Sequence, residues 1–179
     1  MESRIEFRKG LLGDAGKIAE LVNSAYRGES SKLGWTTEAD LLGGQRTDIA
    51  EVSALLNRAD SLFILCEKEG GLVASVHLER CGEEALLGML AVKPGLQGKG
   101  LGKRLLLEAE RKAIESWGAR RMRMAVLTFR QELIEYYQRR GYVRTGRFEA
   151  FPEDPRLGIP KVNGLRFEWL EKAVRNRSD

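Results

Sequence analysis

The spacing of apolar residues changes along the chain, and each change predicts a different element. Ile5 and Phe7 alternate with charged neighbours, which is typical of a strand. Asp14 is placed to cap a helix that runs to about Tyr26, because apolar residues recur there every three or four positions. A polar, glycine-containing loop is expected over residues 28–36.

Two shorter helices are expected before the pattern changes again. Thr37 and Asp40 have the spacing of a capping box, and the glycine pair at 43–44 would end the helix that they open. A second helix is predicted from about Asp48, with Val52 on its apolar face.

From residue 61 the pattern becomes that of strands. Three short apolar segments, 62–66, 72–78 and 85–92, are separated by glycine-containing turns, which predicts an antiparallel meander. Gly88, inside the third segment, predicts a bulge.

A long amphipathic helix follows, from Leu101 to Trp117, and Gly118 is placed to end it. The remaining pattern predicts a strand, a short helix, a proline-bearing loop and a last strand, in the order 122–127, 131–140, 151–163 and 165–170. Together these elements predict one α+β domain over residues 1–179, with a mixed, mostly antiparallel sheet flanked by helices.

Composition excludes several classes of protein. The chain has 179 residues, 42% of them hydrophobic and 31% charged, as expected of a folded globular protein. No apolar run approaches the ~20 residues needed to span a bilayer. The first nine residues lack the apolar stretch of a signal peptide, so we expect a cytoplasmic protein without a membrane partner.

Charge and cysteine usage narrow the choice further. The net charge of +4 is spread along the chain without a basic tract, which gives nucleic-acid binding only weak support as a third alternative, and no nucleic-acid partner is expected. One His and two Cys cannot supply a four-ligand zinc site, so no metal is expected either. Cys66 and Cys81 are interpreted as small buried residues rather than nucleophiles.

The glycine-rich turn after the third meander segment is the most informative stretch. Gly98, Gly100 and Gly102 lead directly into the long helix, with Lys99 and Lys103 between and beside them. A helix N-terminus offers unpaired N–H groups and a positive dipole end, which attract phosphate, and glycines let a ligand approach the backbone. The spacing matches neither the nucleotide P-loop nor the dinucleotide fingerprint.

The pattern that remains, Gln97-x-x-Gly100-x-Gly102 after an apolar strand, resembles the acetyl-CoA-binding motif of the GNAT superfamily of N-acetyltransferases. Downstream, Tyr137-x-x-x-Gly141-Tyr142 is similar to the family's Tyr-x-x-x-Gly-Phe segment. The match is specific over about residues 85–145 and looser elsewhere. The resemblance implies the GNAT fold and acetyl-CoA as cosubstrate.

The resemblance also implies which residues hold the cosubstrate. Backbone groups at the end of the strand would face the pantetheine arm, and the glycine-rich turn would cradle the pyrophosphate. The residues concerned are Leu90, Ala91, Val92, Gln97, Gly98, Lys99, Gly100, Leu101, Gly102 and Lys103. Tyr137 takes the general-acid position, since a neutral phenol can protonate the leaving thiolate, although a core tyrosine would show the same pattern.

Two positions depart from the family pattern. Arg130 stands where many members have Asn, and the strand before the motif lacks the glutamate base of histone-type members. The candidate bases are Glu38, Glu79, the carboxylates at 83–84 and water. His77 is a further candidate as a proton relay, although packing is the more frequent role for a lone strand histidine.

The acceptor site is expected in the region 35–40 and the proline-bearing loop, with Trp35, Glu38 and Glu79 as candidate acceptor-binding residues. Trp35 would wall the pocket or pack between helices. The predicted function is acetyl transfer to a primary amine by direct attack in a ternary complex. A non-catalytic acyl-CoA-binding sensor is the alternative, and a monomer or homodimer is expected.

Overall fold

The fold is built on a seven-stranded sheet. The computed structural model describes residues 4–175. In spatial order the strands are β1 (Ile5–Lys9), β3 (Ser61–Lys68), β4 (Gly71–Cys81), β5 (Glu84–Val92), β6 (Arg121–Leu127), β9 (Arg166–Ala173) and β7 (Val143–Ala150). A separate two-stranded sheet pairs β2 (Leu42–Gly43) with β8 (Ile159–Pro160).

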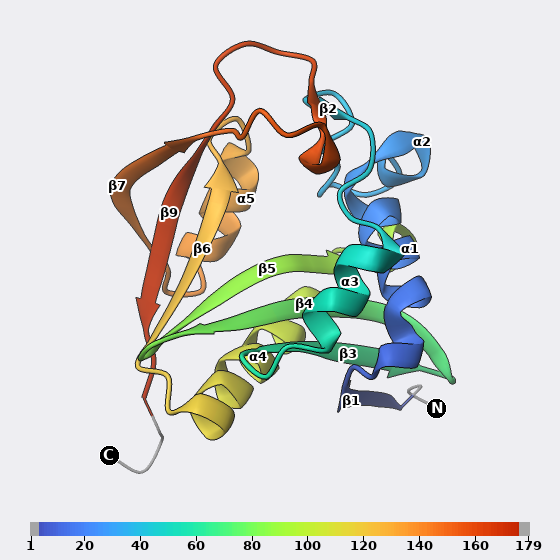
Figure 1. Cartoon of the computed structure of the whole chain (residues 1–179), viewed down its shortest axis with the longest axis vertical. Helices are drawn as coiled ribbons and strands as arrows, with labels where there is room; N and C mark the ends of the chain where they lie inside the picture. The colour runs from blue at the N-terminus through green and yellow to red at the C-terminus, as the bar shows by residue number, and fades with distance from the viewer. Residues whose placement is uncertain (1–3, 176–179) are drawn as a thin grey trace.

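Helices cover both faces of the sheet (Figure 1). The helices are α1 (Ala15–Tyr26), α2 (Gly28–Ser31), α3 (Ile49–Leu56), α4 (Leu101–Trp117) and α5 (Gln131–Gln138), with single 3-10 turns at η1 (Leu12–Asp14), η2 (Pro94–Leu96) and η3 (Pro155–Leu157). One core lies beneath α1 and α3, and a larger one beneath α4 and α5. Because β3 is covered on both faces, Leu62 to Cys66 are all buried, which explains their unbroken apolar run.

The sheet is interrupted between β5 and β6. The two strands are parallel, and they pair only over Glu84–Leu86 with Arg121–Arg123. Beyond this short junction they separate, and β6, β9 and β7 turn away from β5 (Figure 1). The β4–β5 register shifts between Ser75 and His77, and Met89 has φ of 48°. The sequence analysis predicted a bulge at Gly88, and the irregularity confirms a bulge in this strand, centred on the next residue, Met89.

The expected α+β fold is confirmed, but three local expectations were wrong. Residues 37–41 form a turn rather than a helix, because Thr37 Oγ1 accepts from the N–H of Ala39 and bonds Ser31 Oγ. Asp14 does not cap α1, because both of its carboxylate oxygens bind the Arg8 guanidinium at 2.8 Å. Residues 28–31, expected in a loop, form α2.

Strand β7 was not predicted. It lies at the sheet edge beside β9, and all but one of its side chains are exposed, so no apolar alternation marks it. Cys81, expected to be buried, is exposed at the end of β4, whereas Cys66 is buried as expected. Among residues 4–175 no helix combines the length and apolar character needed to cross a membrane.

Candidate active site

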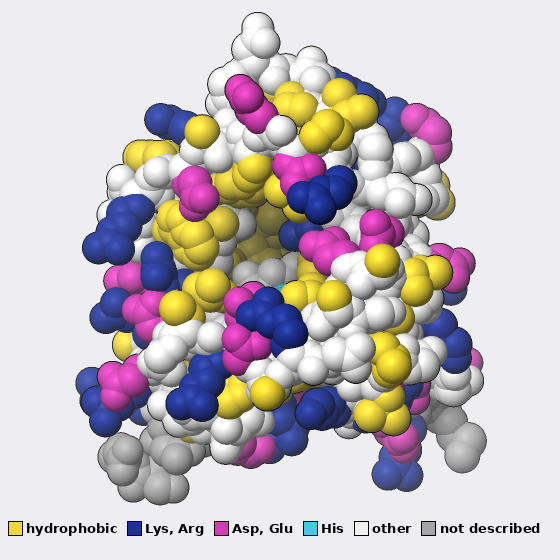
Figure 2. All heavy atoms as spheres, viewed as in Figure 1, with side chains coloured by type: hydrophobic (Ala, Val, Ile, Leu, Met, Phe, Trp, Pro, Cys, Tyr) yellow, Lys and Arg dark blue, Asp and Glu magenta, His cyan; other side chains and the backbone are white. Residues whose placement is uncertain are grey.

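Two cavities meet where β5 and β6 separate. The first, here called the glycine groove, has a volume of about 270 Å³. It is lined by Tyr26, Trp35, Thr36, Leu90, Val92, Gln97, Gly98, Gly100, Gly102, Leu133, Tyr136, Tyr137, Arg139 and Arg140. The second, here called the apolar cavity, has a volume of about 200 Å³. Figure 2 shows a hollow with apolar side chains in this face of the molecule, with charged side chains around its rim.

The floor of the glycine groove is backbone with free hydrogen-bond donors. Gly98 and Gly100 have φ of 76° and 77°, and a Cβ atom at either position would point into open space. The N–H groups of residues 98–103 have no partner in the described part of the chain, and the first bond of α4 runs from the N–H of Arg104 to Gly100 O. Such a row of unpaired donors at a helix N-terminus favours a phosphate ligand.

Side chains add positive charge to this groove. Arg139 and Arg140 line it, and the Arg140 guanidinium lies 3.5 Å from the centre of the Tyr136 ring. Arg140 Nε is buried without a hydrogen-bond partner. Because a buried unpaired donor is costly, this atom favours an anion in the groove. The residues present therefore fit the diphosphate of a coenzyme A thioester.

Gln97 joins the glycine-rich turn to the segment after α2. Its side-chain amide donates to Thr36 Oγ1 at 2.8 Å and to Val92 O at 3.0 Å, and its Oε1 accepts from the N–H of Trp35 at 2.9 Å. The Trp35 ring packs on Tyr136 with centroids 5.3 Å apart. Trp35 therefore lines the glycine groove, and not the apolar cavity where an acceptor-binding role had placed it.

Not every residue implied by the motif lines the groove. Leu90, Val92, Gln97 and the three glycines do. Ala91 faces the opposite way, into the core beneath α1, as strand alternation requires. The Leu101 side chain is buried beneath α4. Lys99 and Lys103 flank the turn, where their backbone N–H groups belong to the unpaired row.

The groove and the apolar cavity share one wall, which consists of Tyr26, Leu90, Leu133 and Tyr137. The Tyr26 hydroxyl donates to Leu90 O and holds the strand beside the bulge. Burial raises the pKa of Tyr26 to about 12. The hydroxyl of Tyr137 makes no hydrogen bond to the described residues, so its proton is available to a ligand at the point where the cavities meet.

The environment of Tyr137 keeps its proton in place. The side chain is buried between α5 and the sheet, with Tyr136 and Tyr142 packed against its ring edge-on. Burial raises the pKa of Tyr137 well above its ordinary value of 10. The hydroxyl is therefore neutral throughout the physiological range and can act as a proton donor.

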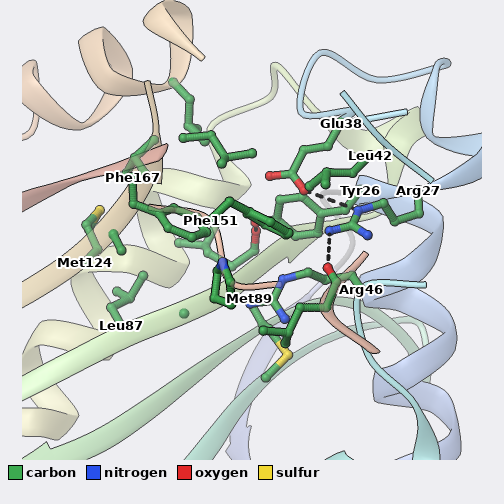
Figure 3. A pocket seen from close by; sticks show the side chains of 18 of the residues that line it. Tyr26, Arg27, Glu38, Leu42, Arg46, Leu87, Met89, Met124, Phe151 and Phe167 are labelled. Carbon is green, nitrogen blue, oxygen red and sulfur yellow. Dashed lines mark hydrogen bonds and ion pairs between the residues drawn. The ribbon is translucent and has the colours of Figure 1, made fainter. Parts of the chain in front are cut away.

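The apolar cavity is walled by side chains from both halves of the sheet and by two loops (Figure 3). Its apolar lining consists of Leu42, Leu87, Met89, Leu90, Met124, Ala125, Val126, Leu127, Leu133, Phe151, Pro152, Leu157 and Phe167. The polar side chains that line it are Tyr26, Arg27, Glu38, Arg46 and Tyr137. The cavity thus combines the expected 35–40 region, through Glu38, with the expected proline-bearing loop.

Arg27 and Glu38 form a buried pair at the rim of this cavity. Arg27 Nε lies 3.3 Å from Glu38 Oε2, and the two side chains are 3% and 12% exposed. The other guanidinium nitrogens donate to Gln45 O and Leu157 O, each at 3.1 Å. Arg130 Nη1 lies 3.6 Å from Glu38 Oε1. Glu38 is therefore held between two arginines.

Glu79 and the carboxylates at 83–84 lie outside both cavities. Glu79 pairs with Arg58 at 2.8 Å at the far end of β4 and lines neither cavity, so the structure does not bring it together with the other candidate acceptor-binding residues. Glu83 and Glu84 pair with arginines near the start of β6. His77 bonds Ser61 Oγ at 2.7 Å, and burial lowers its pKa to about 4, so it is a neutral packed residue.

Sequence reasoning missed Tyr26, Arg27 and Arg46. Tyr26 occupies the apolar face of α1 and is indistinguishable there from a core residue. The two arginines come from stretches without a motif, and only the return of the chain at 151–157 encloses them. Arg139 and Arg140, missed as groove residues, follow Tyr137 by less than one helical turn, so the spacing offered a signal.

The chain matches the model of the acetyltransferase (GNAT) family over residues 19–142. Comparison with curated protein sequences gives no significant match. Among solved structures, an N-acetyltransferase from Staphylococcus aureus Mu50 superposes with a TM-score of 0.72 at 16% identity, over 97% of this chain and 100% of that chain. A GNAT acetyltransferase from Streptococcus pneumoniae gives 0.68 at 18% identity, over 96% and 100%.

A third structure, yncA from Salmonella typhimurium with its cofactor acetyl-CoA, has a TM-score of 0.69 at 17% identity over 98% of this chain and 96% of that chain. At this identity the solved structures establish the fold alone. The family model covers most of the chain, so the protein belongs to the GNAT acetyltransferase family. Acetyl-CoA is its cosubstrate, and the glycine groove has the chemistry to hold it.

Proposed function

We propose that this protein is an N-acetyltransferase that transfers the acetyl group of acetyl-CoA to a primary amine by direct attack in a ternary complex. The glycine groove would hold the coenzyme and the apolar cavity the acceptor. The observation that carries the proposal is the free hydroxyl of Tyr137 in the wall shared by the two cavities. The structural relative from Staphylococcus aureus, described as an N-acetyltransferase, agrees with an amine acceptor.

Binding would use the groove residues in separate roles. The unpaired N–H groups of residues 98–103 would bind the diphosphate, with Arg139 and Arg140 adding charge. The backbone of β5 from Leu90 to Val92 would run alongside the pantetheine arm. Bound acetyl-CoA supplies an activated thioester. The chain's own task is to orient it, exclude water and supply a proton.

The leaving thiolate of coenzyme A needs one proton donor close to its sulfur atom. The amine nitrogen forms a bond to the acetyl carbonyl carbon, and the carbon–sulfur bond breaks with its electron pair on sulfur. Tyr137 Oη would give that sulfur its proton, the acylated nitrogen would release one of its own protons to solvent, and the tyrosinate would be reprotonated from solvent. The hydroxyl of Tyr26, the other tyrosine in the wall, already donates to Leu90 O, so Tyr137 is the better placed acid.

Direct attack is favoured because neither cysteine can serve as an acyl carrier. Cys66 is buried, and burial raises the pKa of its thiol to about 11. Cys81 lies at the end of β4 and lines neither cavity. An acyl-enzyme needs a thiolate beside the bound thioester, and neither residue provides one.

Substitution of Tyr137 tests the assignment. Tyr137→Phe should lower kcat about 10²- to 10³-fold while acetyl-CoA binds as before, because only the proton donor is removed. Tyr142→Phe is the matched control: it removes a buried hydroxyl that bonds Glu110 at 3.1 Å and lines neither cavity. Its turnover should stay at the wild-type level. Thiol release from acetyl-CoA across an amine library measures turnover, and calorimetry measures coenzyme binding.

Each result has a definite reading. Loss of turnover in Tyr137→Phe but not in Tyr142→Phe supports general-acid catalysis. Equal turnover of Tyr137→Phe and the wild type would contradict the role of Tyr137. Tight acetyl-CoA binding without acetylation of any amine would instead support the sensor alternative.

A further inference from the structure

We infer that the acceptor carries a carboxylate beside its amine and an apolar body, and that the guanidinium of Arg46 binds the carboxylate. This inference rests on the proposed function, since it names the class of amine that the apolar cavity takes. The evidence for it is that some charged side chains of that cavity have ion-pair and hydrogen-bond partners within the described residues, whereas another has none.

The carboxylate of Glu38 is not available to attract a cationic amine. It is paired with Arg27 at 3.3 Å and lies 3.6 Å from Arg130, and both arginine side chains are less exposed than Glu38 itself. Arg27 in turn donates to the backbone carbonyls of Gly43, Gln45 and Leu157, so each of its three guanidinium nitrogens already has a partner. These groups form a neutral-to-positive rim, which disfavours polyamines and other polycations.

Arg46 differs from Arg27 in its hydrogen bonding. Its backbone is held by Asn23, but its side chain has no partner among the described residues. Asn23 Oδ1 accepts from the N–H groups of Arg46 and Thr47 at 2.8 and 3.2 Å, and Asn23 Nδ2 donates to Thr47 O at 2.9 Å. Arg46 is half-buried and lines the apolar cavity, and its guanidinium makes no hydrogen bond or ion pair with the described residues. The fold thus holds an unpaired cation at this wall.

The position of Arg46 places that charge near the reacting end of the cavity. Arg46 and Tyr26 both line the cavity and lie on the same side of it, across from Met124 and Leu87 (Figure 3). Tyr26 belongs to the wall shared with the glycine groove. A ligand group on Arg46 therefore lies on the same side of the cavity as the shared wall, which suits a carboxylate a few bonds from the attacking nitrogen.

Geometry and surroundings both favour a carboxylate. The planar guanidinium fork matches the two oxygens of a carboxylate, and such charge-assisted pairs are strong where water is scarce. The opposite wall, with Met124, Phe151 and Phe167, offers only apolar contacts for the rest of the molecule (Figure 3). An amino acid with an apolar side chain satisfies both surfaces.

Paired acceptors test the inference. Leucine, methionine and phenylalanine are compared with isoamylamine, 3-(methylthio)propylamine and 2-phenylethylamine, which are the same amines without the carboxylate. The wild type should favour the carboxylate-bearing member of at least one pair by about tenfold or more in kcat/KM. Arg46→Gln should bring that ratio toward one, chiefly through KM, and Arg46→Lys should retain part of it.

The matched control is Arg147→Gln, which removes an exposed arginine of β7 that lines no cavity described here. It should keep the wild-type preference. A readout independent of turnover compares the binding of N-acetylleucine and N-acetylleucinamide by calorimetry. The wild type should bind the carboxylate form more tightly, and Arg46→Gln should bind the two alike.

The outcomes separate the two proposals. Acetylation of the decarboxylated amines as fast as their partners would overturn the inference and leave the N-acetyltransferase proposal standing. No acetylation at all, with N-acetylleucine still preferred and the preference lost in Arg46→Gln, would overturn the function and keep the carboxylate site. Equal binding of N-acetylleucine and its amide by the wild type would overturn the inference whatever the turnover.

Discussion

At the scale of single residues, hydrogen bonding assigns different roles to similar side chains. Tyr26 and Tyr137 share one wall, but the Tyr26 hydroxyl donates to Leu90 O while that of Tyr137 has no partner among residues 4–175. Arg27 and Arg46 line one cavity, but every guanidinium nitrogen of Arg27 has a hydrogen-bond partner, whereas the Arg46 guanidinium has none in the same described range. The sequence shows residue types and spacing, and it does not show which donors are already used.

The pH dependence of the reaction follows from the groups in the two cavities. No unpaired carboxylate or histidine lines them among the described residues, so under the proposed function the amine would have to reach the site deprotonated. We expect kcat/KM to rise steadily from pH 6 toward the pKa of the amine. The pH profile should show no change of slope near pH 6.5, where an enzymic histidine would titrate. Burial raises the pKa of Tyr137 well above 10, so no fall is expected below about pH 10.

Initial rates between pH 6 and 10, with the best acceptor found and two overlapping buffers, check this expectation. A plateau beginning near pH 7 would reveal an enzymic base, and a decline near pH 8 would contradict the neutral state of Tyr137.

His77 makes the stability of the fold depend on pH. Burial lowers its pKa from 6.5 to about 4, so the unfolded chain binds the proton more readily. The stabilisation that the neutral His77 side chain gives the folded state is complete above pH 6.5. It is lost as the pH falls toward 4, which lowers the free energy of unfolding by about 3 kcal/mol. The hydrogen bond from Arg8 lowers the pKa of Asp14 to about 2. The stability therefore depends on the protonation of Asp14 only below about pH 4.

Urea unfolding at pH 7 and pH 4.5 measures the effect of His77. The wild type should lose about 2 to 3 kcal/mol of unfolding free energy between these values. His77→Phe, which cannot be protonated, should start from lower stability because the bond to Ser61 is gone, but should lose much less with pH. A similar loss in both proteins would show that other groups are responsible.

At the scale of elements, the start of α4 depends on close packing against α5. A Cβ atom on Gly102 would lie 2.9 Å from Tyr136 Oη, whereas one on Gly95 would meet nothing within 4 Å. Gly102→Ala should therefore displace Tyr136 and the ring of Trp35 packed against it, and weaken acetyl-CoA binding about tenfold. Gly95→Ala is the matched control and should bind acetyl-CoA as the wild type does. Calorimetry compares them, and equal affinities would show that this contact is adaptable.

The elements also show where sequence patterns succeed. The meander and α4 were predicted because their apolar faces are buried and regular. Strand β7 was missed because an exposed edge strand has no apolar face to reveal. The expected helix at 37–40 failed because Thr37, the intended cap, is used in a turn with Ser31. Local patterns are informative where burial dictates them, and less so where one side chain has two available partners.

At the scale of the whole molecule, the short β5–β6 junction joins two halves that the coenzyme would bridge. The glycine groove takes residues from β5 and the start of α4 on one side and from α5 on the other. Saturating acetyl-CoA should therefore raise the melting temperature by about 5 to 10 °C at a hundred times its Kd. ATP and NAD at the same concentration are the controls and should give no comparable shift. An unchanged melting temperature would contradict coenzyme binding at the groove.

The long-range features of the site could not be predicted from the sequence. The motif located the groove because its donors are consecutive residues. The apolar cavity combines Arg46, Met124 and Phe151, which lie far apart along the chain and are brought together by the sheet order. No local pattern records that proximity.

Arg27 also joins segments that are distant in the sequence. It ties the segments that carry β2 and η3 to the end of α1, and a Cβ atom on Gly158 would collide with its guanidinium at 2.5 Å. The tied segments contribute Leu42 and Leu157 to the wall of the apolar cavity. Under the proposed function, the acceptor bulk that this cavity admits would be set by the fit between an arginine and a glycine, neither of which has to touch the acceptor's nitrogen.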